Sequence, residues 1–294
     1  MKYKTTARLL TFTVSLLLAS SVFAKSPVFK VSKGDDHLFI GGTIHLLSAN
    51  DYPLPQAFDQ AFDAAEHVYF ETNISEISSP EVQAKLAQVM TLPAGKTLKT
   101  ELNDETYIKL EEFLNERQIP IVALNQLTPG AVSVTLSLLE LQRLGLGDPN
   151  SGVDQFFESK THKVNKSAFY LESLEEQIGF LNSFNSVDSN VIINSSLEDL
   201  SDLTKNWKEA LNAWRVGDME LMSESIGGND LKSEFPQIYK ILLTDRNTRW
   251  VTEIKSMLTS KEVELVLVGA LHLVHDDGLI EQLKRVGYKV EQLD

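Results

Sequence analysis

The stretch PVFKVSKGDDHLFIGGTIHLL, residues 27–47, combines a predicted strand hairpin with a pair of glycines and a histidine. Apolar residues on both sides of the turn-forming sequence KGDD (33–36) predict two antiparallel strands that reverse there. The second strand runs into Gly41 and Gly42 and stops before His45. Glycines at a strand end are typical of a place where the backbone bends sharply or approaches a ligand or another segment closely. We therefore expect the GxxH sequence GTIH (42–45) to contribute to a functional site.

The same order of elements occurs twice, once at each end of the chain. After the first GxxH sequence, QAFDQAFDAAE (56–66) has apolar residues at helical spacing and HVYFETN (67–73) returns as a strand. Near the C-terminus, a strand with its GxxH sequence GALH (269–272) is followed by the helix LIEQLKRVG (279–287) and the strand YKVEQLD (288–294). GxxH alone is a common string. The evidence for a repeat is that both copies directly follow an apolar strand. We predict two related halves of strand, GxxH, helix and strand.

The middle of the chain is mostly helical by its periodicity. Segments with 3.6-residue apolar patterning cover residues 105–118, 130–145, 173–184 and 202–218. Ser173 and Glu176 form a predicted capping box, and Trp207 and Trp214 are expected in the core. Short strands are predicted at IPIVAL (119–124) and SAFYLES (167–173). The fold class is therefore α/β (α+β), with the two pseudo-symmetric halves forming a central sheet and a large helical insertion between them. Because no linker marks a boundary, we predict a single domain over residues 25–294.

Residues 1–24 have the pattern of a secretory signal peptide. They begin with Lys2, Lys4 and Arg8, continue with an apolar run that is short for a membrane span, and end in the small-residue exit VFA (22–24). The alternative is an uncleaved N-terminal anchor. No second long apolar segment follows, so we predict a periplasmic or secreted protein without stable membrane insertion after cleavage.

The composition limits the classes of partner. Loss of residues 1–24 removes three basic and no acidic residues, which changes the formal charge from −14 to −17. Such an acidic chain argues against nucleic acid or anionic lipid as a partner. The chain has no cysteine, so it forgoes disulfides and thiol chemistry. It is compatible with a Gram-negative periplasm.

Three residues stand at predicted strand ends and have the chemistry of metal ligands. In α/β sheets ligands gather beyond the carboxyl ends of the strands, where His45 and His272 would face each other. Glu71 ends the apolar strand VYFE (68–71) at the same level. Two neutral imidazoles and a carboxylate are a common set for a divalent transition metal. The alternative for each residue is a hydrogen-bonded structural histidine or a solvated glutamate.

Four further side chains are candidates around this site. Glu172 ends the predicted strand at SAFYLE and would ligate a metal or transfer a proton, or else lie on the surface. Asp154 would cap a helix or orient one histidine. Arg246 and Asn247 would stabilise negative charge on a substrate oxygen. Their alternatives are an ion pair with an acidic residue for Arg246 and a helix start for Asn247.

The chain resembles the TraB/PrgY/GumN family, which includes the TIKI proteases. The resemblance rests on the ordered motifs GGTIHLL, VYFETN, GVDQFF, YLESLEEQ, DRNTRW and VGALHLVHDDGLIEQLKRVGYKV, and it covers nearly all of residues 25–294. It implies a site made of the two GxxH histidines and a glutamate, which are His45, His272 and Glu71 here. In the TIKI branch it further implies metal-dependent peptide cleavage, with manganese or cobalt favoured and zinc as a further option. His275 stands where a glycine is usual, either as an extra ligand or without a role.

The leading hypothesis is an exported metal-dependent hydrolase that acts on a peptide or small-molecule substrate. Glu71 would be the general base, or a metal ligand with Glu172 as the base, and Arg246 and Asn247 would steady the oxyanion. One alternative is a peptide-binding or sequestering protein of the TraB/PrgY type. Another is a metal-free hydrolase that resembles erythromycin esterases, with a histidine as general base. The sequence leaves the substrate, the native metal and the oligomeric state open.

Overall fold

The N-terminal hairpin forms the start of a mixed sheet in the computed structural model, which describes residues 25–294. Strands β1 (Val28–Lys33) and β2 (Asp36–Thr43) pair antiparallel, with Val31 opposite Leu38. Gly34, with φ of +66°, makes the turn between them. The predicted hairpin is therefore confirmed, whereas the predicted signal peptide, residues 1–24, lies outside the described residues.

The six strands are ordered β4-β3-β5-β2-β1-β6. The other bounds are β3 His67–Phe70, β4 Ser167–Tyr170, β5 Glu264–Gly269 and β6 Lys289–Gln292. Strands β4, β3, β5 and β2 are parallel, and β1 is antiparallel to both of its neighbours. Strand β5 is buried along its whole length, as its apolar run predicts for a strand in the middle of a parallel sheet.

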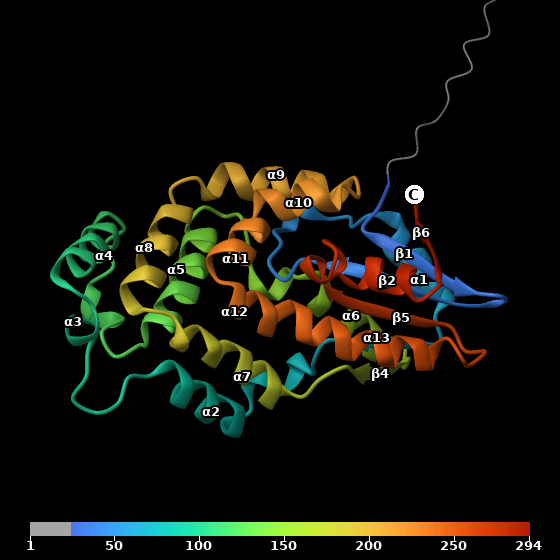
Figure 1. The fold of residues 1–294 in the computed structure, drawn as a ribbon, viewed down its shortest axis with the longest axis horizontal. Helices are drawn as coiled ribbons and strands as arrows, with labels where there is room; N and C mark the ends of the chain where they lie inside the picture. The colour runs from blue at the N-terminus through green and yellow to red at the C-terminus, as the bar shows by residue number, and fades with distance from the viewer. Residues whose placement is uncertain (1–24) are drawn as a thin grey trace, which may run out of the picture.

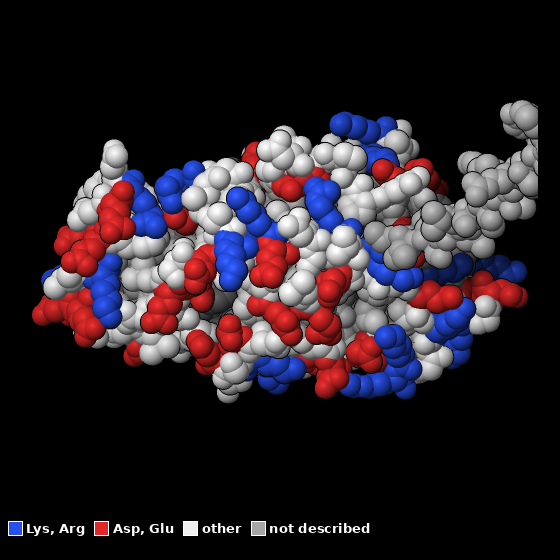
Figure 2. Space-filling view, turned by 90° about the horizontal axis from the view of Figure 1, so that it is seen from above, with Lys and Arg blue, Asp and Glu red and all other residues white. Residues whose placement is uncertain are grey.

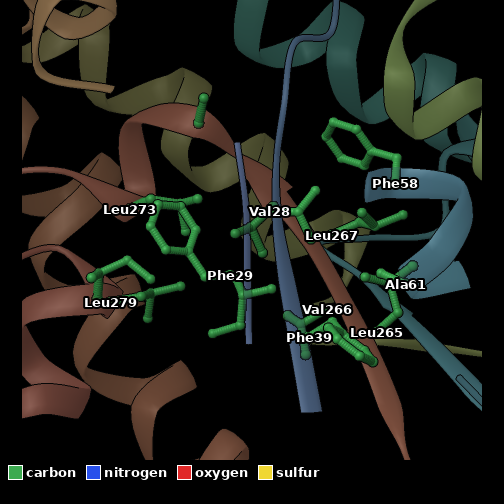
Figure 3. Close-up of a cluster of buried hydrophobic side chains, with 14 of the residues drawn as sticks. Val28, Phe29, Phe39, Phe58, Ala61, Leu265, Val266, Leu267, Leu273 and Leu279 are labelled. Carbon is green, nitrogen blue, oxygen red and sulfur yellow. The ribbon is translucent and has the colours of Figure 1, made fainter. Parts of the chain in front are cut away.

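Both faces of the sheet are covered. The aromatic rings of Phe58 in α1 (Gln56–Ala64) and Phe157 in α6 (Val153–Lys163) stack 5.8 Å apart on one face. A Cβ on Gly41 would meet Phe58, whereas one on Gly42 would meet Leu273, so successive residues of β2 face opposite layers. Figure 3 shows Phe58 on one side of the strands and Leu273 on the other. The face that Leu273 covers continues into α14 (Leu279–Arg285), which packs on α13 (Asp245–Met257).

The helical insertion has a hydrophobic cluster of its own. Helices α3 (Leu98–Glu101), α4 (Asp104–Glu116), α5 (Pro129–Arg143) and α8 (Ser189–Asp199) enclose it, and Figure 1 shows them at the end of the molecule away from the sheet. The remaining helices are α2 (Pro80–Met90), α7 (Leu174–Ser183), α9 (Leu203–Arg215), α10 (Met219–Ser225), α11 (Gly228–Glu234) and α12 (Pro236–Tyr239). Short 3₁₀ turns are η1 (Ala49–Asp51), η2 (Ile74–Ser78), η3 (Ile121–Ala123), η4 (Pro149–Ser151), η5 (Phe184–Ser186) and η7 (Ala270–Leu273), and η6 (Lys240–Thr244) is a π-helical turn. The predicted helices and the Ser173–Glu176 capping box are present.

Two sequence-based expectations about strands were wrong in part. Residues 119–124 form the turn η3 instead of a strand, because Pro120 has no N–H to donate and the backbone closes on itself, as in the bond from Ala123 N–H to the Pro120 carbonyl. The two halves are also not placed symmetrically. Strand β3 lies next to β5, whereas β6 pairs with β1 at the opposite edge of the sheet.

Among residues 25–294, no helix is both long enough and apolar enough to span a membrane. On the face seen in Figure 2, acidic side chains lie among basic ones, and no continuous basic patch is visible there.

Candidate functional site

The two GxxH sequences begin side by side at the carboxyl ends of β2 and β5. Thr43 and Gly269 are paired in the parallel register of these strands. A Cβ on Gly42 would lie 3.2 Å from the Cα of Ala270 and 2.8 Å from a methyl of Leu273, so glycine lets the second motif pack directly on the first. Neither Gly42 nor Gly269 has a positive φ. The structure therefore shows the expected close approach at these glycines, with ordinary negative φ angles.

The three predicted metal-ligating residues meet at Gly269. A Cβ at this position would lie 3.2 Å from Oε1 of Glu71, 3.4 Å from Nε2 of His45 and 3.6 Å from Cδ2 of His272. The Oε1 atom of Glu71 is also 3.8 Å from Nε2 of His272. The structure thus brings His272 together with two side chains that lie more than 200 residues earlier in the sequence, around a space that glycine keeps open.

His272 is buried and neutral. Its Nδ1 is 2.6 Å from Oδ1 of Asn247, whose amide nitrogen donates to the Asp277 carbonyl at 2.9 Å. The amide therefore presents its oxygen to the ring, which places the proton on Nδ1 and leaves the Nε2 lone pair free. Burial lowers the pKa of His272 to about 3, although Glu71 acts in the opposite direction. A neutral imidazole with a free Nε2 can accept a proton or bind a metal.

His45 has a different partner. Its Nδ1 lies 2.7 Å from Oδ2 of Asp154, and the hydroxyl of Thr43 donates to the other oxygen of that carboxylate at 2.7 Å. The Asp154 carboxylate raises the pKa of His45 above its ordinary value. The N-cap of α6 is Gly152, so Asp154 orients the histidine and is not the cap. The arrangement matches the common pattern in which a carboxylate fixes the ring of a metal-binding histidine.

Glu71 is buried and ionised. Its Oε1 accepts the N–H of Gly269 at 2.6 Å, and its Oε2 pairs with the Arg246 guanidinium. Burial alone would raise the pKa of Glu71, but Arg246 and the two histidines hold it well below its ordinary value. Because a carboxylate oxygen has two lone pairs, Oε1 keeps one acceptor position on the side of the histidines.

Glu172 shares the same arginine. Arg246 donates to it from Nε at 3.1 Å and from Nη2 at 2.5 Å, and Gln177 Nε2 donates at 2.5 Å. Burial raises the pKa of Glu172 to about 7, although Arg246 favours the ionised form. Its side chain has no exposed surface, so Glu172 does not reach the cleft directly.

Arg246 and Asn247, which we predicted to steady an oxyanion, are hydrogen-bonded to other groups of the protein. The Arg246 guanidinium lies between the rings of Phe180 and Trp250 and is fully engaged by the two glutamates and the Leu242 carbonyl. The side-chain amide of Asn247 bonds to His272 through its oxygen and to the Asp277 carbonyl through its nitrogen. The polar groups of both side chains are therefore paired within the protein, although Arg246 also lines a cavity at the site. Their role in steadying an oxyanion stays a prediction.

The site opens into two cavities that share His45, Leu46, Glu71 and Gln177. One, of about 540 Å³, is walled by α2, α5 and α7; the other, of about 330 Å³, lies between α9, α10, η6 and η7. Trp207 lines the smaller cavity and so is not purely a core residue, whereas Trp214 is buried and donates to the Gly42 carbonyl. Gln177 is the last residue of the motif YLESLEEQ in the helical insertion, but no role at the site was predicted for it.

The donor chemistry fits a divalent metal, although the ligand set is not already assembled. Among residues 25–294, no three His, Asp or Glu side chains form a ready cluster for a metal ion. Nε2 of His45, Oε1 of Glu71 and the ring of His272 nevertheless lie around the space beside Gly269, and Nε2 of His272 is 3.8 Å from that Oε1. His275 is not part of this group, because its Nε2 bonds to the hydroxyl of Ser223 at 2.8 Å.

The chain is similar over most of its length to one protein family and to individual proteins. The family model described as the TraB/PrgY/gumN family matches residues 27–292. The "Uncharacterized protein YbaP" of Escherichia coli (strain K12) is 24% identical over 254 residues, which cover 85% of this chain and 89% of that protein. The protein "Metalloprotease TIKI1" of Danio rerio is 22% identical over 311 aligned positions, which cover 88% of this chain and 61% of that protein. No solved structure has a significant match.

Proposed function

The chain belongs to the TraB/PrgY/gumN family, and we propose that it is an exported metal-dependent hydrolase that cleaves peptide bonds. The observation that carries the proposal is the convergence of His45, His272 and Glu71 around Gly269. The distant similarity to a protein named as a metalloprotease supports the same reaction class.

The two histidines are the proposed ligands, and Glu71, which lies beside them, is the general base or else the third ligand. A divalent ion held by them would provide a bound water of lowered pKa and would polarise the scissile carbonyl. Manganese or cobalt is favoured by the family resemblance, and zinc is compatible with the donor set. Because His45 must lose its proton to act as a ligand, binding should weaken as the pH falls.

The carboxylates of the site would handle protons. Glu71 is ionised and has an acceptor position on the side of the histidines, so it would take a proton from the attacking water and pass it to the leaving amine. Arg246 and Gln177 each bond to both Glu172 and Glu71. Because the pKa of Glu172 is about 7, Glu172 would bind and release protons near neutral pH on the buried side of Glu71. This assignment makes Glu71 the general base, which is the first of the two roles that we predicted for it.

A second candidate is a metal-free hydrolase, which the different partners of the two histidines favour. Asp154 promotes the protonated form of His45, and burial keeps His272 neutral. The pair would then act as general acid and general base. Activity that survives chelation would support this reading, and binding of peptides without product would support a sequestering protein.

The first test is elemental analysis of mature protein, residues 25–294, after dialysis with manganese, cobalt or zinc. We expect about one ion per chain, lost in the His45→Ala/His272→Ala double variant and kept in His162→Ala, a control at an exposed histidine. Cleavage of a peptide library, read by mass spectrometry, then tests the hydrolase itself. Equal metal content in the folded double variant and the wild type would refute the proposed site.

Export is proposed from the sequence of residues 1–24. If the signal peptide is cut after Ala24, N-terminal sequencing of protein from a periplasmic extract or the medium should begin at Lys25. An intact N-terminus in the membrane fraction would indicate an anchor instead. The acidic composition leads us to propose peptide or small-molecule substrates and no nucleic acid, with the oligomeric state to be measured on the same preparation.

A further inference from the structure

The proposed site lies at a junction and not at the end of a pocket. We call the cavity of about 540 Å³ between α2, α5 and α7 the first chamber, and that of about 330 Å³ between α9, α10, η6 and η7 the second chamber. Both are lined in part by His45 and Glu71. Each is within the size range of a ligand pocket. A ligand that fills both must therefore pass over the two residues.

The walls of both chambers are mainly apolar. Val82, Leu86 and Ile178 line the first chamber, and Met222, Ile226 and Leu243 line the second. An apolar wall favours apolar groups because their burial removes surface from water, while an unpaired polar group would lose hydrogen bonds there. The side chains of the ligand that enter the chambers should accordingly be apolar on both sides of the site.

The charges of the lining are already paired within the protein. Among the described residues that line the chambers, Arg246 is the one Lys or Arg, and both Glu71 and Glu172 bind it. The lining carboxylates are Glu71 and Asp154, which bind Arg246 and His45. Neither a free cation for a terminal carboxylate nor a free carboxylate for a terminal amine is therefore present in the lining.

We propose that the cleft binds an extended peptide segment with an apolar side chain in each chamber, so that the bond at the site is internal and not terminal. This inference rests on the proposed function for the cleavage itself, but the binding geometry is independent of it. The two sides should be selected by different residues. Leu86 of α2 and Ile226 after α10 are half-buried wall residues, so larger side chains there would fill a chamber without opening the core.

The test uses metal-loaded mature protein and four peptides of equal length. They carry leucine on both sides of a central bond, on the N-terminal side only, on the C-terminal side only, or on neither side, with alanine elsewhere and free termini. Cleavage is followed by mass spectrometry, and binding is followed by calorimetry with copies whose central bond is a reduced, uncleavable linkage. The doubly apolar peptide should be preferred by about tenfold or more over either single one in both assays, since one hydrophobic pocket contributes at least that much.

Two variants assign the chambers to the two sides. Leu86→Trp should lower kcat/KM and affinity about tenfold for peptides with leucine on one side of the bond, and Ile226→Trp should do so for the other side. Val216→Trp, at an exposed position of the same helical region as the second chamber, should change neither. Release of single terminal residues, a preference for the alanine peptide, or equal behaviour of all three variants would overturn the proposal.

The outcomes separate this inference from the hydrolase. Histidine-dependent cleavage without the two-sided preference would leave the hydrolase standing and refute the two-chamber geometry. Binding that prefers leucine on both sides, without any cleavage product, would support the two-chamber geometry and refute the hydrolase. Neither binding nor cleavage of the four peptides would overturn both.

Discussion

The side-chain oxygen of Asn247 accepts a 2.6 Å hydrogen bond from Nδ1 of His272, while the equivalent atom of His45 lies 2.7 Å from a carboxylate oxygen of Asp154. The two GxxH histidines thus have the same place in their motifs and opposite electrostatic surroundings. An amide leaves a buried imidazole neutral, whereas a carboxylate stabilises the imidazolium. The two histidines therefore differ in how readily they bind a proton.

Replacement of Asn247 by alanine should release the ring of His272. It removes the acceptor of Nδ1 and the donor to the Asp277 carbonyl, both buried, so we expect a loss of about 1–3 kcal/mol in the free energy of unfolding. Metal affinity should fall by about 10- to 100-fold, the usual effect of losing such an orienting partner. Thermal unfolding and metal titration measure the two effects. Asn115→Ala on the exposed face of α4 is the control, and an unchanged affinity in Asn247→Ala would contradict the orienting role.

Replacement of Asp154 by asparagine should bring the pKa of His45 back toward its ordinary value of about 6.5. Asp154 raises this pKa in the folded protein, so the contribution to stability is present below the unfolded-state pKa and is lost as the pH rises through the folded one. The variant should therefore be destabilised more at pH 6 than at alkaline pH. Histidine NMR titration of metal-free protein measures the shift, with Asp59→Asn on the surface as control. An unshifted His45 in the variant would argue that the carboxylate does not act on it.

Much of the fold and part of the site follow from sequence patterns. The hairpin, strand β5 and the second GxxH sequence lie where apolar periodicity and glycine placement put them, and Glu71 stands at the predicted strand end. Strand-end position is a local property, so the sequence can reveal it. This is why the convergence of Glu71 with both histidines was predictable before any contact was known.

Contacts between residues that are far apart in the sequence could not be predicted from these local patterns. Arg246 is 74 residues from Glu172 and 175 from Glu71, and no local pattern shows that one guanidinium lies between these two carboxylates. The contribution of Gln177 was missed for the same reason. Strand β6 lies at the edge of the sheet because it pairs with β1. This pairing is set by how the strands pack in the fold, and the β6 sequence alone does not reveal it.

The contribution of Glu172 to stability should fall as the pH rises from about 5 to 8, and Glu172→Gln should remove this contribution from the slope of stability against pH. Burial raises the pKa of Glu172 to about 7, so the folded state retains a proton that the unfolded state has already released. When the folded state binds more protons, the free energy of unfolding decreases with rising pH. Urea unfolding of metal-free protein at several pH values measures the slope, and Glu175→Gln at an exposed position of α7 is the control. A wild-type slope equal to that of Glu172→Gln would show that Glu172 is ionised throughout.

Replacement of Gly269 by alanine should remove the proposed site while leaving the fold intact. The added methyl would lie 3.2 Å from Oε1 of Glu71, which is closer than ordinary van der Waals contact, and 3.4 Å from Nε2 of His45, so it would occupy the space between these side chains. Since the backbone there has no positive φ, the main cost is this local crowding, and we expect a loss of about 1–3 kcal/mol in the free energy of unfolding. Metal content and peptide cleavage should fall to the level of the histidine double variant. Gly179→Ala in α7 is the matched control, because a Cβ there meets no atom within 4 Å and alanine favours the helix by about 1 kcal/mol. Retained metal binding in folded Gly269→Ala would place the ion elsewhere, because the three side chains could not then hold it beside this glycine.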